Sequence, residues 1–387
     1  MKRTAKFLFL TLSAALLASC GQKEPQADPT REPELSATPD AAGNPTTPET
    51  KPTAEPEPTT PATEPTTEPA PTKPAAEPTA EPDPTEPAAD PTAEPAPTEP
   101  AADPTAESNP TESGTLPDGF SALCPDEVSK KRADTAYGTV IHKTYASKTT
   151  GLDRGVSILL PPNYSDEKTY PVLYLLHGIF GNEYTLIQDA SCKIPEISAN
   201  LAADGLAKEM LIVLPDMYAK TDPAQAPAFT AEAVAPYDNF INDLVNDLIP
   251  YIEENFSVLT DRENRAIAGF SMGGRESLFI GFSRPDLFSS VGAISPAPGL
   301  TPGRDWAMSH PGQFQEEELV FDASAEVPYL MVCCGDSDKT VGKFPESYHR
   351  IMTENGVEHV WYEIPGADHD STAIRSGLNN FLSSIFR

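Results

Sequence analysis

Beyond residue 137, short runs of apolar residues alternate with segments in which apolar residues recur every three or four positions. The apolar runs lie at residues 156–160, 171–176, 210–214, 266–270, 291–294, 329–333 and 360–364. Runs that are apolar on both faces are typical of parallel strands with helices on each side of the sheet. The pattern therefore predicts a mostly parallel central sheet covered by helices on both faces.

The intervening segments have the period of amphipathic helices. They lie at residues 195–209, 240–256, 272–282, 348–355 and 371–386. The segment 240–256 places its large apolar residues on one stripe, and a proline inside it is a candidate for a bend. Strands that alternate with helices predict one α/β domain at residues 118–387, with its active site beyond the carboxyl ends of the strands.

The segment 21–117 has a composition unlike that of the predicted domain. It holds 25 of the 43 prolines, together with 20 acidic and 4 basic residues, and almost no large apolar residue. The ten residues 85–94 recur unchanged at 98–107. Such a chain cannot bury enough apolar surface to offset the entropy of ordering. We therefore expect a disordered, extended linker rich in Pro, Thr, Ala and Glu.

Residues 1–20 have the pattern of an export signal. Basic residues precede an apolar run that is too short to span a bilayer as a mature helix, and small residues precede Cys20. Leu-Ala-Ser-Cys at 17–20 is similar to the lipobox of bacterial lipoproteins, in which the cysteine is acylated. We predict an exported protein, anchored to the bacterial membrane by lipid at Cys20 and facing the extracellular side. An ordinary signal peptide that happens to contain Cys20 is the alternative.

Charge and cysteine content narrow the range of partners. The formal net charge of −31 argues against nucleic acid as a partner and against membrane contact other than through the lipid anchor. No Cys/His spacing resembles a zinc site, and we expect neither a metal nor a cofactor. Cys333 and Cys334 are expected to be buried free thiols. Cys124 and Cys192 could form a disulfide after export, although their spacing does not require one. Nothing in the sequence indicates the oligomeric state.

A candidate nucleophile lies at the end of the apolar run 266–270. The residues from Gly269 to Gly274 read Gly-Phe-Ser-Met-Gly-Gly and open a predicted helix, which is the context expected of a G-x-S-x-G nucleophile elbow. A side chain at Gly269 or Gly273 would collide with neighbouring backbone on such a sharp turn. We therefore expect Ser271 to be the nucleophile of a hydrolase, although a tight turn with a structural serine would have a similar sequence.

A serine hydroxyl needs a general base, and the base needs an orienting acid. In this architecture the chain order is serine, acid, histidine. We favour His369 as the base because it lies in a loop just past the last apolar run, while His349 and His359 lie within predicted elements and are expected to be ordinary side chains. By position alone, Asp336 and Asp338 qualify equally as the acid, and the other one is expected to cap the loop or the next helix.

Backbone N–H groups should stabilise the oxyanion of the tetrahedral intermediate. One donor is expected at Met272, directly after the nucleophile. The other is expected at Ile179, in the loop that follows the apolar run 171–176. We expect His177 to brace this loop rather than to act as a base.

The domain resembles the carbohydrate esterase family that contains bacterial feruloyl esterases and acetyl xylan esterases, within the esterase D-like α/β-hydrolases. The resemblance rests on residues 171–183, 237–256, 261–274, 334–342 and 366–370. It implies an α/β-hydrolase fold, Asp338 as the acid in a Gly-x-x-Asp turn, and His369 as the base in a Gly-x-x-His turn. Relatives often have His-Gly-x-Gly-Gly in the oxyanion loop, and Phe180 replaces one of these glycines here.

The resemblance implies hydrolysis of feruloyl or acetyl esters on plant xylan, without metal or cofactor. A surface-anchored serine esterase acting on acylated plant cell-wall polysaccharide is the hypothesis that also accounts for export and for the linker. Two alternatives are a serine esterase for another exported small ester, such as a siderophore-type ester, and a non-catalytic binding lipoprotein. Turnover of simple esters by the isolated domain would separate the last alternative from the other two.

Overall fold

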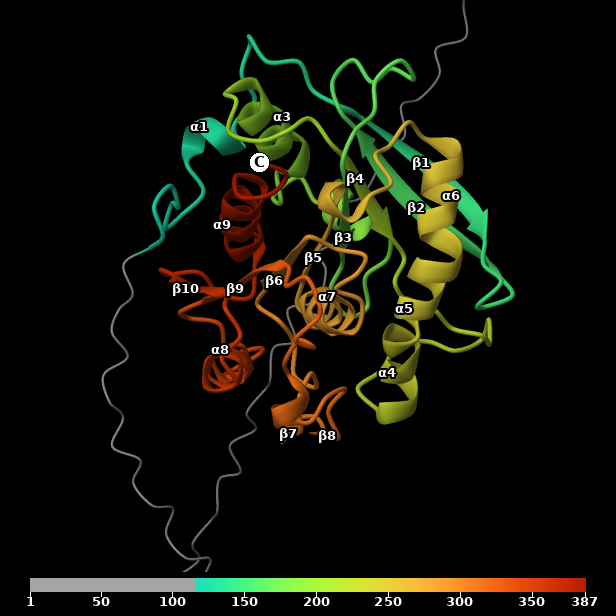
Figure 1. The fold of residues 1–387 in the computed structure, drawn as a ribbon, viewed down its shortest axis with the longest axis vertical. Helices are drawn as coiled ribbons and strands as arrows, with labels where there is room; N and C mark the ends of the chain where they lie inside the picture. The colour runs from blue at the N-terminus through green and yellow to red at the C-terminus, as the bar shows by residue number, and fades with distance from the viewer. Residues whose placement is uncertain (1–115) are drawn as a thin grey trace, which may run out of the picture. The chain divides into compact units, whose positions relative to one another are not determined.

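The computed structural model describes residues 116–387, and the central feature of this part is an eight-stranded sheet (Figure 1). The predicted export signal with Cys20, and the predicted linker up to residue 115, lie outside the described residues. The strands in chain order are β1 (Thr139–Ala146), β2 (Asp153–Leu160), β3 (Val172–Leu176), β4 (Leu211–Pro215), β5 (Arg265–Phe270), β6 (Ser290–Ile294), β9 (Tyr329–Gly335) and β10 (Val360–Ile364).

The sheet is mostly parallel, as the apolar runs predicted. Its strand order is β1-β2-β4-β3-β5-β6-β9-β10. The pairs from β4 to β10 are parallel, whereas β1 with β2 and β2 with β4 are antiparallel. The antiparallel edge strand β1 was not predicted because most of its residues are exposed or half-buried and only Tyr145 is buried, so it has no continuous apolar run. A two-stranded ribbon, β7 (Gly303–Arg304) with β8 (Ser309–His310), lies apart from the main sheet.

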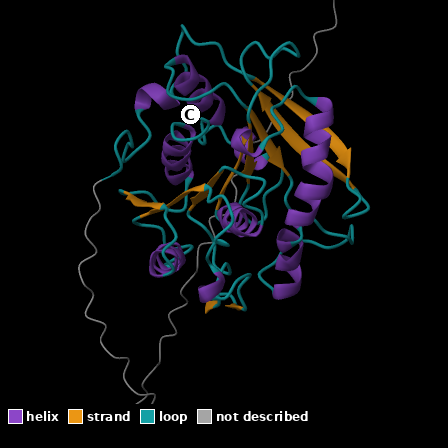
Figure 2. Ribbon diagram, in the orientation of Figure 1, coloured by secondary structure: helices purple, strands orange, loops and turns teal. Residues whose placement is uncertain are grey.

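Helices cover both faces of the sheet (Figure 2). The helices are α1 (Asp126–Ser129), α2 (Thr185–Gln188), α3 (Ile194–Ala203), α4 (Ala231–Asp238), α5 (Phe240–Asp243), α6 (Ile249–Asn255), α7 (Met272–Ser283), α8 (Phe344–Glu354) and α9 (Ser371–Leu382). One core contains the inward residues of α5 to α8, and the other those of α1, α3 and α9. Alternate residues of β3 enter the two cores: Tyr174 enters the first, and Leu173 and Leu175 enter the second.

Four predicted helices differ from the observed ones: α8 begins four residues before the predicted start at 348, α9 ends at Leu382 and not at 386, and the other two differ as follows. The segment 195–209 was expected to be helical throughout, but α3 ends at Ala203 because Gly205 adopts a left-handed conformation with φ of 70°. The segment 240–256 is helical as predicted, but a π-helical turn at Leu244–Leu248 separates α5 from α6. This turn precedes Pro250, whose nitrogen cannot donate a hydrogen bond.

The cysteines of the described residues are all free. Cys124 and Cys192 therefore form no disulfide, which answers the question that their spacing left open. Cys333 and Cys334 are buried free thiols, as expected. Between residues 116 and 387, no helix combines the length and the apolar character needed to cross a membrane.

Candidate active site

Ser271 lies on the turn between β5 and α7 in a rarely populated backbone conformation, with φ of 58° and ψ of −118°. Such conformations cost about 1–3 kcal/mol and persist only where the surroundings hold them. Here the Ser271 N–H donates to the carbonyl of Ile294 at 3.0 Å, and the Ser271 carbonyl accepts from the N–H of Ala297 at 2.9 Å. A Cβ on Gly269 would lie 2.3 Å from the backbone of Gly273, which confirms the predicted need for glycine on this turn.

The structure brings His369 and Asp338 together. The Nδ1 of His369 lies 2.8 Å from the Oδ2 of Asp338, whose side chain is fully buried. Burial raises the pKa of the Asp338 carboxyl, but hydrogen bonds from His369 and Ser295 and the charge of His369 outweigh burial, so this pKa lies below its usual value. Asp336 instead accepts a hydrogen bond from the N–H of Gly366 at 2.9 Å, so it caps the loop, as expected of the aspartate that is not the acid.

Ser271 and His369 line one cavity of about 300 Å³. The ring of Phe270, the residue before the serine, packs against the imidazole of His369 with 4.4 Å between ring centroids. The other aspartates near the histidine have separate tasks, because Asp370 caps the N-terminus of α9 and Asp368 accepts from the His369 N–H. The cavity therefore combines a serine hydroxyl with an imidazole whose other nitrogen is held by a buried carboxylate.

The two predicted oxyanion donors, Ile179 and Met272, line the same cavity. Within residues 116–387, the backbone N–H groups of Ile179 and Met272 have no hydrogen-bond acceptor. Met272 is the first residue of α7, so its N–H also lies at the positive end of the helix dipole. Both N–H groups are therefore available to an oxygen atom of a bound ester.

His177 braces the loop that carries Ile179, as predicted. Its Nε2 accepts from the N–H of Met217 at 3.0 Å, and its Nδ1 therefore donates to the carbonyl of Gly178 at 2.7 Å. A side chain on Gly181 would meet this imidazole, since its Cβ would lie 2.7 Å from His177 Nδ1. The histidine thus ties the oxyanion loop to the segment that follows β4.

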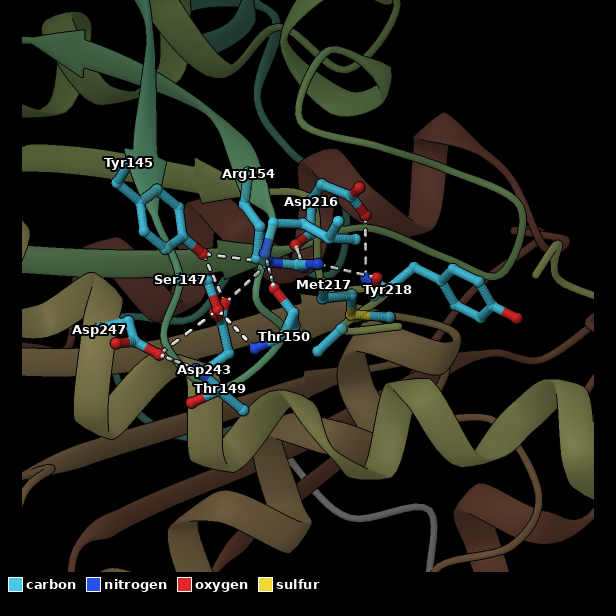
Figure 3. Close-up of polar contacts among 12 residues, drawn as sticks. Tyr145, Ser147, Thr149, Thr150, Arg154, Asp216, Met217, Tyr218, Asp243 and Asp247 are labelled. Atoms are coloured by element: carbon cyan, nitrogen blue, oxygen red, sulfur yellow. Dashed lines mark hydrogen bonds and ion pairs between the residues drawn. The ribbon is translucent and has the colours of Figure 1, made fainter. Parts of the chain in front are cut away.

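A buried polar network holds the segment after β4 in place (Figure 3). Arg154 of β2 donates to the carbonyls of Asp216 and Tyr218, and its Nε lies 2.9 Å from a carboxylate oxygen of Asp243. The hydroxyl of Tyr145 donates to the same oxygen. Breaking a buried ion pair of this kind leaves a charge without its partner, which costs about 3–5 kcal/mol. The network therefore fixes the position of Met217 and, through His177, that of the oxyanion loop.

Three exposed aromatic side chains lie at the rim of the cavity. Phe180, Phe229 and Trp306 come from three separate segments and have exposed fractions of 54%, 44% and 75%. Phe229 packs edge-to-face against both neighbours, with ring centroids 5.1 Å from Phe180 and 5.2 Å from Trp306. The sequence had singled out Phe180, whereas Phe229 and Trp306 lie in loops that carry no motif.

The ribbon of β7 and β8 adds a second imidazole to the cavity wall. His310 is largely buried, and its Nε2 lies 3.1 Å from the carboxylate of Asp305, which also lines the cavity. His349 and His359, the histidines not favoured as the base, pair with each other at 2.8 Å, so neither is an isolated surface side chain. In the part of the chain that the structure describes, no group of three or more His, Cys, Asp or Glu side chains could hold a metal ion.

The strand order, the strained serine turn and the paired histidine and aspartate define an α/β-hydrolase. The family model described as "Putative esterase" matches residues 147–352, more than half of the chain. The chain therefore belongs to this esterase family.

Two similar proteins are described as feruloyl or ferulic acid esterases. A CE1 ferulic acid esterase from Anaeromyces mucronatus, solved in complex with ferulic acid, has 45% sequence identity and a TM-score of 0.65, and the match covers 69% of this chain and 97% of that chain. An endo-1,4-beta-xylanase/feruloyl esterase from Xylanibacter ruminicola is 32% identical over 267 residues, 66% of this chain. The chain spans 32% of the length of that enzyme.

Proposed function

We propose that the protein is a serine esterase that hydrolyses feruloyl esters on plant xylan through Ser271, His369 and Asp338. The observation that carries this proposal is the common cavity of Ser271 and His369, with the hydrogen bond from His369 to the buried carboxylate of Asp338 behind it. Membership of an esterase family and the likeness to feruloyl esterases support the reaction and the acyl group.

Each residue has a defined step in this reaction. His369 takes the proton of Ser271 Oγ as the oxygen attacks the ester carbonyl, and Asp338 stabilises the imidazolium that forms. The N–H groups of Met272 and Ile179 donate to the oxyanion of the tetrahedral intermediate. When the intermediate collapses, the bond to the sugar oxygen breaks and His369 protonates that oxygen. Water, deprotonated by His369, then hydrolyses the acyl-enzyme and restores the serine hydroxyl.

The lining of the cavity favours an aryl acyl group over an acetyl group. A cavity of about 300 Å³ with walls of Ile179, Phe270, Met272 and Val341 is larger than an acetyl group needs. Apolar lining with a few polar groups is typical of sites for ligands that are themselves largely apolar. At the aromatic rim, Phe229 and Trp306 offer apolar faces on which a sugar ring of the leaving group would pack, and exposed apolar patches of this kind mark binding sites.

Export and anchoring complete the proposal. An export signal at residues 1–20, lipid on Cys20 and an extended linker at 21–117 would place the domain outside the cell at a distance from the membrane. A polymer such as xylan cannot enter the cell, so an enzyme that acts on it gains from this placement. The cell surface is therefore the location we propose.

A comparison of esters tests the proposal. Methyl ferulate, acetylated xylan and tributyrin should be offered side by side to residues 116–387 and to the Ser271→Ala variant, which keeps the turn and loses the nucleophile. We expect the highest kcat/KM on methyl ferulate and no turnover by the variant. Equal activity of the variant would remove Ser271 from the mechanism, and no activity of a folded wild-type domain on any ester would favour the non-catalytic lipoprotein. Preference for tributyrin would favour another exported small ester.

The aromatic rim has its own test. Trp306→Ala should raise KM severalfold on feruloylated xylan oligosaccharides while kcat/KM on methyl ferulate, which lacks the sugar, changes less than twofold. Val327→Ala is a matched control, because Val327 is also an exposed apolar residue but does not line the cavity. Equal losses on both substrates would assign Trp306 to the acyl group instead of the sugar.

A further inference from the structure

The carboxylate of Asp338 has more hydrogen-bond donors than His369 alone. Its Oδ1 accepts from the N–H of Thr340 at 3.0 Å and of Val341 at 3.3 Å, both in the turn that follows. Its Oδ2 accepts from His369, and the thiol of Cys334 lies 3.8 Å from the same oxygen. The oxygen that faces the base therefore has a second donor, the thiol of the penultimate residue of strand β9.

Ser295 stands behind this thiol. Its hydroxyl donates to the Sγ of Cys334 at 3.7 Å, and the residue is completely buried. It follows directly on β6, where its φ of 46° is unusual for a residue with a side chain. Its N–H donates to the carbonyl of Cys333 at 2.7 Å, which holds it against β9. The serine hydroxyl, the thiol and the carboxylate thus form a line that leads to His369.

The neighbouring cysteine provides a contrast within the same strand. Side chains alternate between the faces of a strand, so Cys333 points to the opposite side of the sheet from Cys334. Cys333 belongs to the apolar core that includes Phe381 and Leu378. Its sulfur would lie 3.0 Å from a Cβ on Gly377, so it fills space against α9. Of these two adjacent buried thiols, Cys334 therefore contacts the carboxylate of Asp338, whereas Cys333 contacts apolar core residues.

Other charged groups near Asp338 make no hydrogen bond to it. A second cavity lies beside Asp338 and Cys334, and the remaining titratable side chains that line it are Asp336, Lys339, Lys343, Glu346 and Glu363. Lys343 pairs with Glu346 at 2.8 Å, and Asp336 caps the loop. Among the described side chains, His369 and Cys334 lie 2.8 Å and 3.8 Å from Oδ2 of Asp338, and the hydroxyl of Ser295 also helps to lower the pKa of this carboxyl.

We propose that Ser295 and Cys334 are positioning residues that hold the Asp338 carboxylate with Oδ2 toward His369 and share its negative charge. The proposal rests on the proposed esterase function. A carboxylate with fewer donors carries more charge on its oxygens, so it stabilises the imidazolium of His369 more strongly. Loss of either residue should then keep His369 protonated at higher pH. It should also let the Asp338 carboxylate rotate, so that Oδ2 no longer points at His369 Nδ1.

The test is the pH dependence of kcat/KM on methyl ferulate for Ser295→Ala, Cys334→Ala and the double variant. We expect the midpoint of the acidic limb to move to higher pH by about 0.3–0.5 pH units in each single variant, since a thiol hydrogen bond is at the weak end of the usual range. We expect kcat at the optimum to fall about threefold to tenfold. The double variant should shift less than the sum, because the two groups act in one line.

Cys333→Ala is the matched control, and Cys334→Ser is the conservative variant. Cys333→Ala removes an equally buried thiol, so it should lower stability and leave the acidic limb in place. Cys334→Ser keeps a hydrogen-bond donor near Oδ2 of Asp338. The midpoint of its acidic limb should therefore lie close to the wild-type pH. Equal behaviour of Cys333→Ala and Cys334→Ala, with no movement of the limb, would overturn the proposal and leave both thiols as packing groups.

A second measurement does not depend on catalysis. The proton that His369 Nδ1 donates to Asp338 should have a far-downfield NMR resonance, which can be followed in the Ser271→Ala background. This resonance should move on Cys334→Ala and not on Cys333→Ala. If the protein with Ser271 intact hydrolyses no ester, a shift of the resonance would still support the positioning, and the esterase function alone would fail. An unmoved resonance in an active enzyme would overturn the positioning alone.

Discussion

Phe180 occupies a backbone conformation that suits glycine, with φ of 66°. A residue with a Cβ pays about 1–2 kcal/mol in this region. The ring contact with Phe229 and the hydrogen bond from the Phe180 N–H to the hydroxyl of Tyr237 at 3.0 Å hold it there. A side chain at this point narrows the mouth of the cavity where relatives of the resembled family often have glycine.

Replacing Phe180 should separate backbone strain from ring contact. Phe180→Gly relieves the strain and removes the ring, whereas Phe180→Ala keeps the strain and removes the ring. Both should raise KM for methyl ferulate by about twofold to tenfold, since an aromatic pair contributes about 0.5–1.5 kcal/mol. Thermal denaturation should show the glycine variant to be the more stable of the two. An unchanged KM in both variants would mean that the ring does not touch the acyl group.

Asp338 and Asp336 should differ sharply when each is changed to asparagine. Asp338→Asn should lower kcat by up to about 10⁴-fold, because an amide in place of the carboxylate favours the wrong tautomer of His369. Asp336→Asn should have a mild effect, since an amide oxygen can still accept from the Gly366 N–H. Steady-state kinetics on one soluble ester decides between them, and the reverse ranking would move the acid to Asp336.

The residues that the sequence could indicate are those in local motifs. Ser271 lies in a six-residue pattern, and the loop position of His369 distinguished it from the other histidines. The choice between Asp336 and Asp338 needed the resemblance, because both directly follow the same strand. Phe229, Trp306 and His310 carry no signal, since only the folding of distant loops brings them to the cavity.

At the scale of elements, a pair of histidines joins α8 to the residue directly before β10. His359 accepts at Nε2 from His349 Nδ1, since its own Nδ1 donates to the carbonyl of Val357. The ring of His349 stacks on Trp361. Burial lowers the pKa of both imidazoles below the usual value of 6.5, and in His349 the neighbouring His359 lowers it further. The unfolded chain therefore takes up protons before the folded chain does.

This pair predicts a loss of stability on mild acidification. Its contribution is complete above pH 6.5 and falls as the pH drops toward the lowered values of the folded state. Between pH 7.5 and pH 5.5, the melting temperature of the His359→Gln variant should fall by about 2–4 °C less than that of the wild type, as expected for about 1 kcal/mol in a domain of this size. Parallel curves for the two proteins would show that the pair is not responsible.

The apolar pattern predicted the type of most strands and helices, but it predicted their ends less well. Buried strands such as β3 and β5 have continuous apolar runs, so their positions follow from the sequence within a residue. The end of α3 depended on the left-handed glycine at 205, which apolar spacing does not reveal. The ribbon of β7 and β8 has two residues in each strand, too few for any periodicity.

At the scale of the whole molecule, the predicted linker has a role that kinetics can isolate. Deleting residues 51–110 should leave kcat and KM on a soluble ester unchanged, because the disorder predicted from the sequence implies no fixed contact with the active site. On intact cells the deletion should lower the release of ferulate from particulate cell wall, since the linker would set the reach of a domain anchored as we propose. A parallel loss of both activities would contradict the spacer role.

The start of the described chain is part of the domain. The N–H and carbonyl of Ser121 exchange hydrogen bonds with the side chain of Asn380 in α9, and the ring of Phe120 packs against Tyr362 in β10. Leu116 also packs against the core, two residues before the predicted boundary at 118. A chain that begins at Asp126 should therefore melt at a lower temperature than one that begins at Leu116.

The free cysteines determine how the domain can be handled. Since no disulfide joins any of the cysteines in residues 116–387, folding of this part requires no oxidant and no isomerase. The domain can therefore be produced in the reducing cytoplasm of an expression host and purified in the presence of thiol reductants. Its melting temperature and its activity should be the same with and without them, and a protein with this property suits reactors in which fermenting biomass keeps the medium strongly reducing.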